Sequence, residues 1–425
     1  MRTLVRSLLT APMAALLALA PSFAAEPAPP TLRVSREPGR IVIQFEGILM
    51  AAESLLGPWT EIPGAVSPLA LELSSAPYRF FQARHPTAPA GVFASRTPAH
   101  WTLTGAFQDH FELAHAGMPD GIFPPVREKP YFTGSVVVDG LTVPASLRVR
   151  GNSSLQECPF PKLKLKIARD DRTNTPFAEA RELKIGSHCA EGGRGPIGRL
   201  RDETATYREA LAYEVAETLG FTIPRVRRAV LTYLDTSTPG PDSPTGWQLQ
   251  RQALLIEDPE VLGERLGGRA LSDEEIEALN HANFPPTLIL DLHLLHALLG
   301  NWDYALSTTG EELWNTDVIQ LENGLLIPLP GDFDLASWVT GEVRLNAPHD
   351  YRPELPDLER EMRFRIGQLR EQFPADLFAA SVVRFTLARS AVEAQVQSME
   401  VDAEGRLNAQ LHLGAFYAIL AETRP

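Results

Sequence analysis

The stretch DVIQLENGLLIPLPGDFDLASW, residues Asp317–Trp338, predicts a β-hairpin inside a part of the chain that is otherwise helical in pattern. Two apolar runs flank Asn323–Gly324, a dipeptide typical of tight hairpin turns. Beyond the second run, Asp332 and Asp334 stand on either side of Phe333. If this segment is extended, its side-chain period of two puts both carboxylates on one face and Phe333 on the other. Two like charges held together need a cation, a shared proton or open water.

The sequence before and after this hairpin predicts an α+β chain. A β-rich half comes first, and a mostly helical half follows after Glu260. Strands are predicted at 134–140, 145–151, 162–168, 227–235 and 252–258. A long amphipathic helix is predicted over 203–220, ended by Gly220. In the second half, helices are predicted at 272–282 and 285–300 and again beyond Pro353.

The N-terminal residues predict export. Residues 1–25 combine Arg2 and Arg6 with a short apolar core and small residues at a cleavage-like spacing, the pattern of a secretory signal peptide. We therefore expect a secreted or periplasmic protein, with no transmembrane segment in the rest of the chain. Short β-branched and aromatic runs over 31–88 predict a small all-β module suited to attachment or packing, and a linker at 86–91 leads into the remaining residues, 92–425.

Charge and cysteine content narrow the classes of function. A formal net charge of −14 argues against a nucleic-acid partner, because phosphate backbones favour positive surfaces. The two cysteines, Cys158 and Cys189, can form one disulfide or remain two thiols, and the sequence leaves both open. A zinc site with four cysteine ligands is excluded by their number.

A concentration of cations marks the segment ASLRVRGNSSLQECPFPKLKLKIA, residues 145–168. Arg148 and Arg150 share one face of the first predicted strand, and Lys162, Lys164 and Lys166 share one face of the second. One interpretation is a phosphate cradle, with the GNSS loop supplying backbone N–H groups and hydroxyls. The alternative is a solvated strand face whose lysines protect a sheet edge.

Carboxylates form two further candidate groups. Glu209 lies mid-helix among alanines and leucines, so it is either exposed or paired, for example with the lysine strand. Asp303 follows an apolar helix end, Asn315 precedes the hairpin, and Asp332 and Asp334 follow it. Carboxylates and a carboxamide in this arrangement suit magnesium-dependent phosphoryl transfer. The alternative is that Asp303 and Asp332 are ordinary loop and turn residues.

A histidine pair offers a third candidate group. His293 and His296 are three residues apart on one predicted helix, a spacing that allows a transition-metal site with Asp291 or Asp303. The alternative is that both histidines lie at helix–helix contacts. The sequence contains no G-x-S-x-G, H-E-x-x-H or G-x-x-x-x-G-K-[ST] motif, so several classes of hydrolase and NTPase are excluded.

Several of these motifs together resemble the spore coat protein H (CotH) kinase family and its secreted relatives. The resemblance runs over about 92–348 and rests on LRVRGNSS…PKLKLKI, LKIGSHC, YREALAYEV, GNWDYALS, WNTDVIQL and IPLPGDFDLAS. It implies an atypical, two-lobed protein-kinase-like domain over 92–425, with a β-rich lobe at about 92–260 and a mainly helical lobe at about 261–425. The small β-module would precede this domain.

The resemblance also implies roles for individual residues. Asp303 corresponds to the catalytic aspartate, and the magnesium ligands are Asn315, Asp332 and Asp334. Lys164 or Lys166 would contact the phosphates of ATP, with Glu209 as the helical partner and Arg150 near the nucleotide or the substrate. Two features depart from ordinary protein kinases: eleven residues separate Asp303 from Asn315, and GDFDLAS lacks the glycine of D-F-G.

Three classes of function remain open on the sequence. The first is a secreted atypical kinase that transfers a phosphoryl group from ATP, with Mg²⁺, to a protein Ser/Thr or another hydroxyl acceptor. The second is a catalytically degenerate kinase-fold protein for extracellular attachment or assembly, since ATP is scarce outside the cytoplasm. The third is a hydrolase that uses Asp303 and Asp332 as acid and base, which leaves the cations unexplained.

Overall fold

The structure is a computed structural model that describes residues 31–45, 48–52, 60–62, 65–72, 80–84, 91–115, 129–151, 160, 162–187, 204–238, 246–301, 303–304, 313, 315–341 and 358–423. The predicted signal peptide, residues 152–154 of the GNSS loop and both cysteines lie outside these residues. The chain divides into two compact units. One comprises Met1–Ala94 with Asn174–Pro176, and the other comprises Ser95–Thr173 with Phe177–Pro425.

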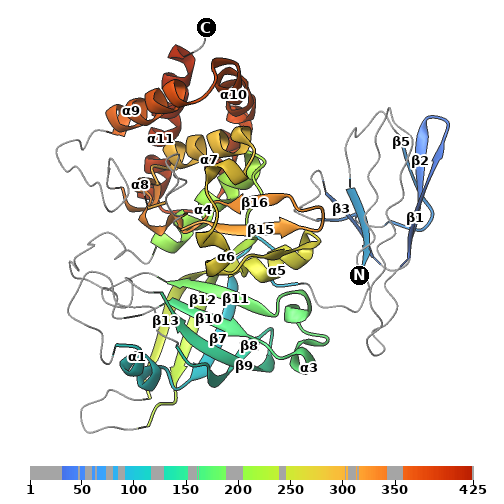
Figure 1. Ribbon diagram of the computed structural model, residues 1–425. Coiled ribbons are helices and arrows are strands. Elements are labelled where there is room, and N and C mark those ends of the chain that lie inside the picture. The colour runs from blue at the N-terminus through green and yellow to red at the C-terminus, as the bar shows by residue number, and fades with distance from the viewer. Residues whose placement is uncertain are drawn as a thin grey trace. The chain divides into compact units, whose positions relative to one another are not determined.

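The described part of residues 31–84 is built from strands (Figure 1). They form two three-stranded antiparallel sheets, ordered β1-β2-β5 and β4-β3-β6. Their bounds are β1 Leu32–Glu37, β2 Arg40–Phe45, β3 Ile48–Ala52, β4 Thr60–Glu61, β5 Leu69–Glu72 and β6 Phe80–Arg84. Leu32, Ile43, Phe45, Leu49 and Phe81 form one hydrophobic core to which both sheets contribute.

The second unit begins with a closed barrel in the order β10-β11-β13-β12-β7-β8-β9. Neighbouring strands are antiparallel except for the parallel pair β7 and β12. The strands are β7 Ala99–Gly105, β8 Phe132–Val138, β9 Leu141–Arg150, β10 Lys162–Lys166, β11 Glu182–Ser187, β12 Val226–Asp235 and β13 Gln248–Glu257. The strands predicted at 134–140, 145–151, 162–168, 227–235 and 252–258 are confirmed as β8, β9, β10, β12 and β13.

Helices and a small sheet make up the rest of this unit, and Figure 1 shows α7 to α11 gathered on the side away from the barrel strands. The helices are α1 Phe107–His115, α3 Arg169–Arg172, α4 Ala205–Thr218, α5 Pro259–Arg265, α6 Asp273–Glu277, α7 Pro286–Leu299, α8 Ser337–Thr340, α9 Leu358–Gln372, α10 Ala375–Ser398 and α11 Ala403–Glu422, with 3₁₀ turns η1 Pro176–Glu179, η2 His281–Asn283 and η3 Phe333–Leu335. The sheet contains β14 Gly268–Ala270, β15 Asp317–Leu321 and β16 Leu326–Leu329. None of the described helices combines the length and apolar character needed to cross a bilayer.

The hairpin predicted around Asn323–Gly324 is confirmed, since β15 and β16 pair in antiparallel register. Gly324 adopts a positive φ of 82°, which a residue without Cβ tolerates at no steric cost. The Asn323 side chain accepts a hydrogen bond from the Leu325 N–H. The turn is therefore stabilised by the residues that predicted it.

Helix α4 differs from its prediction. It ends where expected, and Gly220 takes a φ of 87° while the Phe221 N–H donates to Ala216 O, a Schellman closure. The helix is not amphipathic, however, because it lies between the barrel strands β12 and β13 on one side and α8, α10 and η3 on the other. Residues Ala205 to Ala216 are all buried, Glu209 among them.

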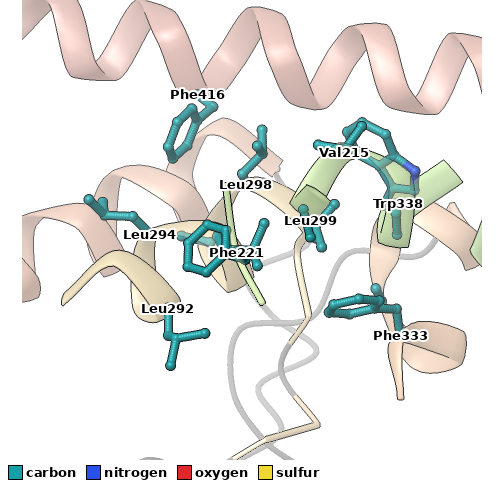
Figure 2. Close-up of a cluster of buried hydrophobic side chains, with 14 of the residues drawn as sticks. Val215, Phe221, Leu292, Leu294, Leu298, Leu299, Phe333, Trp338 and Phe416 are labelled. Carbon is teal, nitrogen blue, oxygen red and sulfur yellow. The ribbon is translucent and has the colours of Figure 1, made fainter. Parts of the chain in front are cut away.

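The main hydrophobic core lies where α4 meets the C-terminal helices (Figure 2). Val215 comes from α4, Leu298 and Leu299 from α7, and Phe416 from α11. Phe333 and Trp338 belong to the same core and are fully buried. The short segment between them is therefore held firmly at both ends. At the level of a mixed α+β chain the predicted fold is confirmed, while the two-lobed kinase-like domain stays a prediction.

Candidate functional site

The outer face of the barrel at β9, β10 and β11 carries the cations. Antiparallel pairing sets Lys162 opposite Arg150, and Lys164 opposite both Arg148 and Lys184. The alternating leucines, Leu163 and Leu165, are buried inside the barrel. The prediction that the arginines of β9 and the lysines of β10 share one face is confirmed, because partners directly opposite in a sheet point to the same side.

The acidic turn that follows β16 points toward this face. Asp332 is not extended, the condition under which the two carboxylates were expected on one face; it adopts a left-handed conformation with φ of 50° and leads directly into η3. The Asp332 N–H donates to Tyr213 Oη at 3.1 Å. Even so, both carboxylates lie on one side, because Lys162 Nζ is 2.6 Å from Asp334 Oδ2 and 3.5 Å from Asp332 Oδ1. Phe333 points the other way, into the core.

Electrostatics around Lys162 follow from this geometry. Burial works to lower the pKa of Lys162, but the carboxylates of Asp334 and Asp332 outweigh it and raise that pKa above its ordinary value. The charge of Lys162 in turn lowers the pKa of Asp332. Burial, reinforced by the charge of Asp334, raises the pKa of Glu209 to about 8. The site thus holds a charged lysine between two aspartates, with a protonated glutamic acid nearby at neutral pH.

Lys164 and Lys166, the lysines assigned to ATP phosphates, have other partners. Lys164 Nζ lies 2.8 Å from Glu182 and 2.9 Å from Asp258, and Lys166 Nζ lies 2.8 Å from Glu182. Their role in binding phosphate stays a prediction, but it is Lys162 that lies beside the acidic turn. No sequence signal distinguishes the three alternating lysines, because the choice depends on how the barrel is placed against the turn.

Glu209 lies on the face of α4 that meets η3. Glu209 and Tyr213 are four residues apart on α4 and therefore lie on one face of the helix. That face meets η3, and the ring of Tyr213 packs edge-on to Phe333 at 4.8 Å. Within the described residues, the ion pairs of Lys162 are with Asp332 and Asp334, and Glu209 acts on it at longer range. Tyr213 is a residue of this site that the sequence did not predict.

Asp303 and Asn315 are brought together in a second arrangement. Gly300 ends α7 with φ of 58°, and the following residue, Asn301, is fully buried. The Asn301 side chain accepts a hydrogen bond from the Asp303 N–H at 3.2 Å. Asn315 Nδ2 donates to Asp303 O at 2.7 Å, which leaves the amide oxygen of Asn315 for another partner. Asn301, which orients the candidate base through its backbone, was also missed by the sequence analysis.

The residues of the alternative histidine metal site contact other side chains in the structure. His293 Nδ1 lies 2.7 Å from Tyr304 Oη, and the ring of His296 stacks on that of Tyr304 at 3.5 Å. Asp291, the carboxylate of this alternative, instead contacts the guanidinium of Arg384. Burial holds the pKa of His296 well below its usual range, so its imidazole stays neutral. This arrangement favours histidines at helix contacts.

A further group of side chains that could bind a metal ion comes from β11 and the start of α5. The described residues hold one group of three carboxylates whose ligand atoms lie within 4.8 Å of one another, formed by Glu182, Asp258 and Glu260. Lys164 lies against two of these three carboxylates and compensates their charge. We interpret the group as an ion cluster that ties β10 and β11 to the start of α5.

We compared the chain with models of protein families, with curated proteins and with solved structures. The chain matches no model of a known protein family, and no curated protein matches it. Among the solved structures that match is the crystal structure of a Helicobacter pylori proinflammatory kinase, CtkA. It is 10% identical, covers 62% of this chain and 89% of that chain, and has a TM-score of 0.30. A structural neighbour of this protein is thus a kinase, but similarity this low carries no argument about the site.

Proposed function

We propose that this chain is an atypical, two-lobed kinase-like enzyme, preceded by a small β-module and exported by its N-terminal signal peptide. It would transfer a phosphoryl group from ATP, with Mg²⁺, to a protein Ser/Thr hydroxyl or another hydroxyl acceptor. The observation that carries the proposal is the contact of Lys162 with both Asp334 and Asp332 at the junction of the barrel and the helical part. A cation and two carboxylates are groups that phosphoryl transfer uses, and Asp303 with Asn315 would supply the base and a further metal ligand.

The donor set of this site fits magnesium. Asp332 and Asp334 supply carboxylate oxygens, and Asn315 supplies an amide oxygen that its own hydrogen bond to Asp303 leaves available. The side chain of Asp332 is 41% exposed and can meet a hydrated ion without unfolding the turn. Bound there, the ion would neutralise charge on the phosphates.

The remaining steps belong to residues of the chain itself. Asp303 would accept the proton of the acceptor hydroxyl, whose oxygen forms a bond to the γ-phosphorus of ATP as the bond to the β–γ bridging oxygen breaks and ADP leaves. Asn301 and Asn315 would keep Asp303 in place, through its N–H and its carbonyl oxygen respectively. Lys162 would exchange part of its contact with Asp334 for a phosphate oxygen.

A thermal-unfolding titration tests this proposal. The melting temperature of the full chain would be measured with ATP alone, Mg²⁺ alone and both together, for the wild type, Asp332→Asn and Asp317→Asn. Asparagine is chosen at position 332 because it tolerates the left-handed backbone. Asp317 is the matched control, since it pairs with another lysine of the same barrel face, Lys184.

We expect a rise in melting temperature that needs both ligands, is lost in Asp332→Asn and is kept in Asp317→Asn. At a ligand concentration of about 100 times Kd the stabilisation is about 2.7 kcal/mol. Asp303→Asn should bind as the wild type does but fail to transfer label from γ-labelled ATP. The absence of any rise at millimolar ligand would count against the proposal.

A second candidate function is a kinase-fold protein that no longer catalyses and serves in extracellular attachment or assembly. One observation favours it: Lys162, Lys164 and Lys166 all have carboxylate partners already, so none of these ammonium groups awaits a phosphate. This function predicts that Asp303→Asn and Asp332→Asn leave the biological role intact. Loss of that role in either variant would argue for the enzyme.

A further inference from the structure

The cationic side chains of the paired strands β9 and β10 differ in their ion-pair partners. Each lysine of β10 lies against at least one carboxylate. Among the described residues, the arginines of β9 that face them have no such partner: Arg148 lies over the ring of Tyr131 at 4.9 Å, and Arg150 forms no ion pair. The Nε of Arg150 is buried and has no hydrogen-bond acceptor there. Like charges directly opposite each other destabilise a sheet, and among the described residues this cost is offset for Arg150 only at longer range, by the charge of Asp332.

A third cation lies beside these two. Lys129, just before β8, donates a hydrogen bond to Gly151 O, the carbonyl that follows Arg150. Burial lowers the pKa of Lys129, and the charges of Arg148 and Arg150 lower it further. In a chain with a net charge of −14, this is a local excess of positive charge.

We propose that Arg148 and Arg150, together with Lys129, form a subsite for an anion that carries several phosphate groups. Two observations support this ligand: the buried Nε of Arg150 has no acceptor within the described part of the chain, and two guanidinium groups lie on alternate residues of one strand. Alternate residues are about 7 Å apart, so the two guanidinium groups can each hold a different phosphate of one chain, whereas a single small anion meets both only if the two side chains converge. The planar fork of arginine also matches phosphate oxygens in pairs.

The subsite adjoins the acidic turn. Arg150 faces Lys162 across the sheet, and its charge acts on both Asp332 and Glu209. A polyphosphate bound to the arginines would therefore end near the carboxylates that we assign to magnesium. The inference deepens the proposed function and rests on it for the assignment to a nucleotide, but the subsite itself requires neither metal nor catalysis.

Isothermal titration of the full chain with inorganic tripolyphosphate, without divalent metal, tests the subsite. The variants are Arg148→Gln/Arg150→Gln and, as a control with the same change of charge, Arg181→Gln/Lys184→Gln. Arg181, just before the neighbouring strand β11, pairs with Glu260, and Lys184 on β11 pairs with Asp317. We expect the first variant to weaken binding at least tenfold and the control to stay within about twofold. Orthophosphate should bind much more weakly than tripolyphosphate.

Further variants separate this inference from the proposed function. Asp332→Asn should keep metal-free tripolyphosphate binding even where binding of ATP with magnesium is lost. Arg148→Lys/Arg150→Lys keeps the charge but not the fork, and we expect an intermediate affinity. If tripolyphosphate displaces ATP, the subsite takes the nucleotide's phosphates, and if it does not, it takes another phosphate-bearing ligand; both results support an anion subsite.

Equal affinity in the wild type and in Arg148→Gln/Arg150→Gln, with the fold intact by circular dichroism, would overturn the inference. So would the absence of binding heat at millimolar tripolyphosphate. Either result leaves the proposed function standing, provided that ATP with magnesium still raises the melting temperature of the wild type. The two hypotheses can therefore fail separately.

Discussion

The ion pair between Lys162 and Asp334 gives the sharpest test of how this site is built. Nζ and Oδ2 are 2.6 Å apart, and the two side chains are only 12% and 13% exposed. Lys162→Met keeps most of the side-chain volume but leaves Asp334 as a poorly solvated charge. Removing one partner of a buried pair costs about 3–5 kcal/mol, so we expect a loss of that size in the free energy of unfolding.

Urea unfolding at pH 7 of Lys162→Met, Asp334→Asn and the double variant measures the coupling between the two residues. The double variant should lose clearly less than the two single variants together, since neither charge is then left alone. The control pair is Lys184 with Asp317, at 3.1 Å, where the side chains are 26% and 46% exposed. Lys184→Met should cost less than about 1 kcal/mol, because solvent screens an exposed pair.

Two outcomes would refute this reasoning. A loss in Lys162→Met no larger than that in Lys184→Met would mean that burial does not set the energy of the pair. Strict additivity in the double variant would mean that Lys162 and Asp334 stabilise the fold independently. The contact would then be a poor foundation for the proposed site.

Two more predictions concern the helical part. Burial raises the pKa of Glu361 on α9 from 4.5 to about 8, so the wild type loses stability as the pH rises from about 4.5 to 8. In urea unfolding measured across this pH range, the stability of Glu361→Gln relative to the wild type should rise by roughly 2–4 kcal/mol, and a constant difference between the two would contradict the prediction. In Gly300→Ala the new Cβ would lie 1.9 Å from Ser337 Oγ at a φ of 58°, so we expect the free energy of unfolding to fall by roughly 2–4 kcal/mol. Gly324→Ala, where the new Cβ meets open space, should lose about 1 kcal/mol. Equal losses in the two variants would contradict the steric argument.

Local patterns predicted much of the barrel and hairpin. The alternation in KLKLK predicted which side chains of β10 face outward, because a strand has a fixed side-chain period of two. Asn323–Gly324 predicted the turn between β15 and β16, because few residues accept a positive φ there. Gly220 and Gly300 marked the ends of α4 and α7 for the same reason.

The same patterns failed where several elements converge. Helix α4 was predicted to be amphipathic, but it is packed on both sides, and this burial is what raises the pKa of Glu209. The common face of Asp332 and Asp334 was argued for an extended segment, but Tyr213 and the burial of Phe333 hold a left-handed turn at Asp332 instead. Local sequence carries no information on what packs against the opposite side of an element.

By itself, then, the sequence determined the types of the elements, the side of β10 that carries charge, and the residues from which a phosphoryl-transfer site can be assembled. It did so because backbone conformation and side-chain period depend on near neighbours. Only the tertiary structure decided that Lys162 rather than Lys164 or Lys166 meets Asp334, and that Arg148 and Arg150 form no ion pair with a carboxylate of the described residues. Those outcomes depend on how the barrel packs against α4 and η3, which brings together residues far apart in the chain.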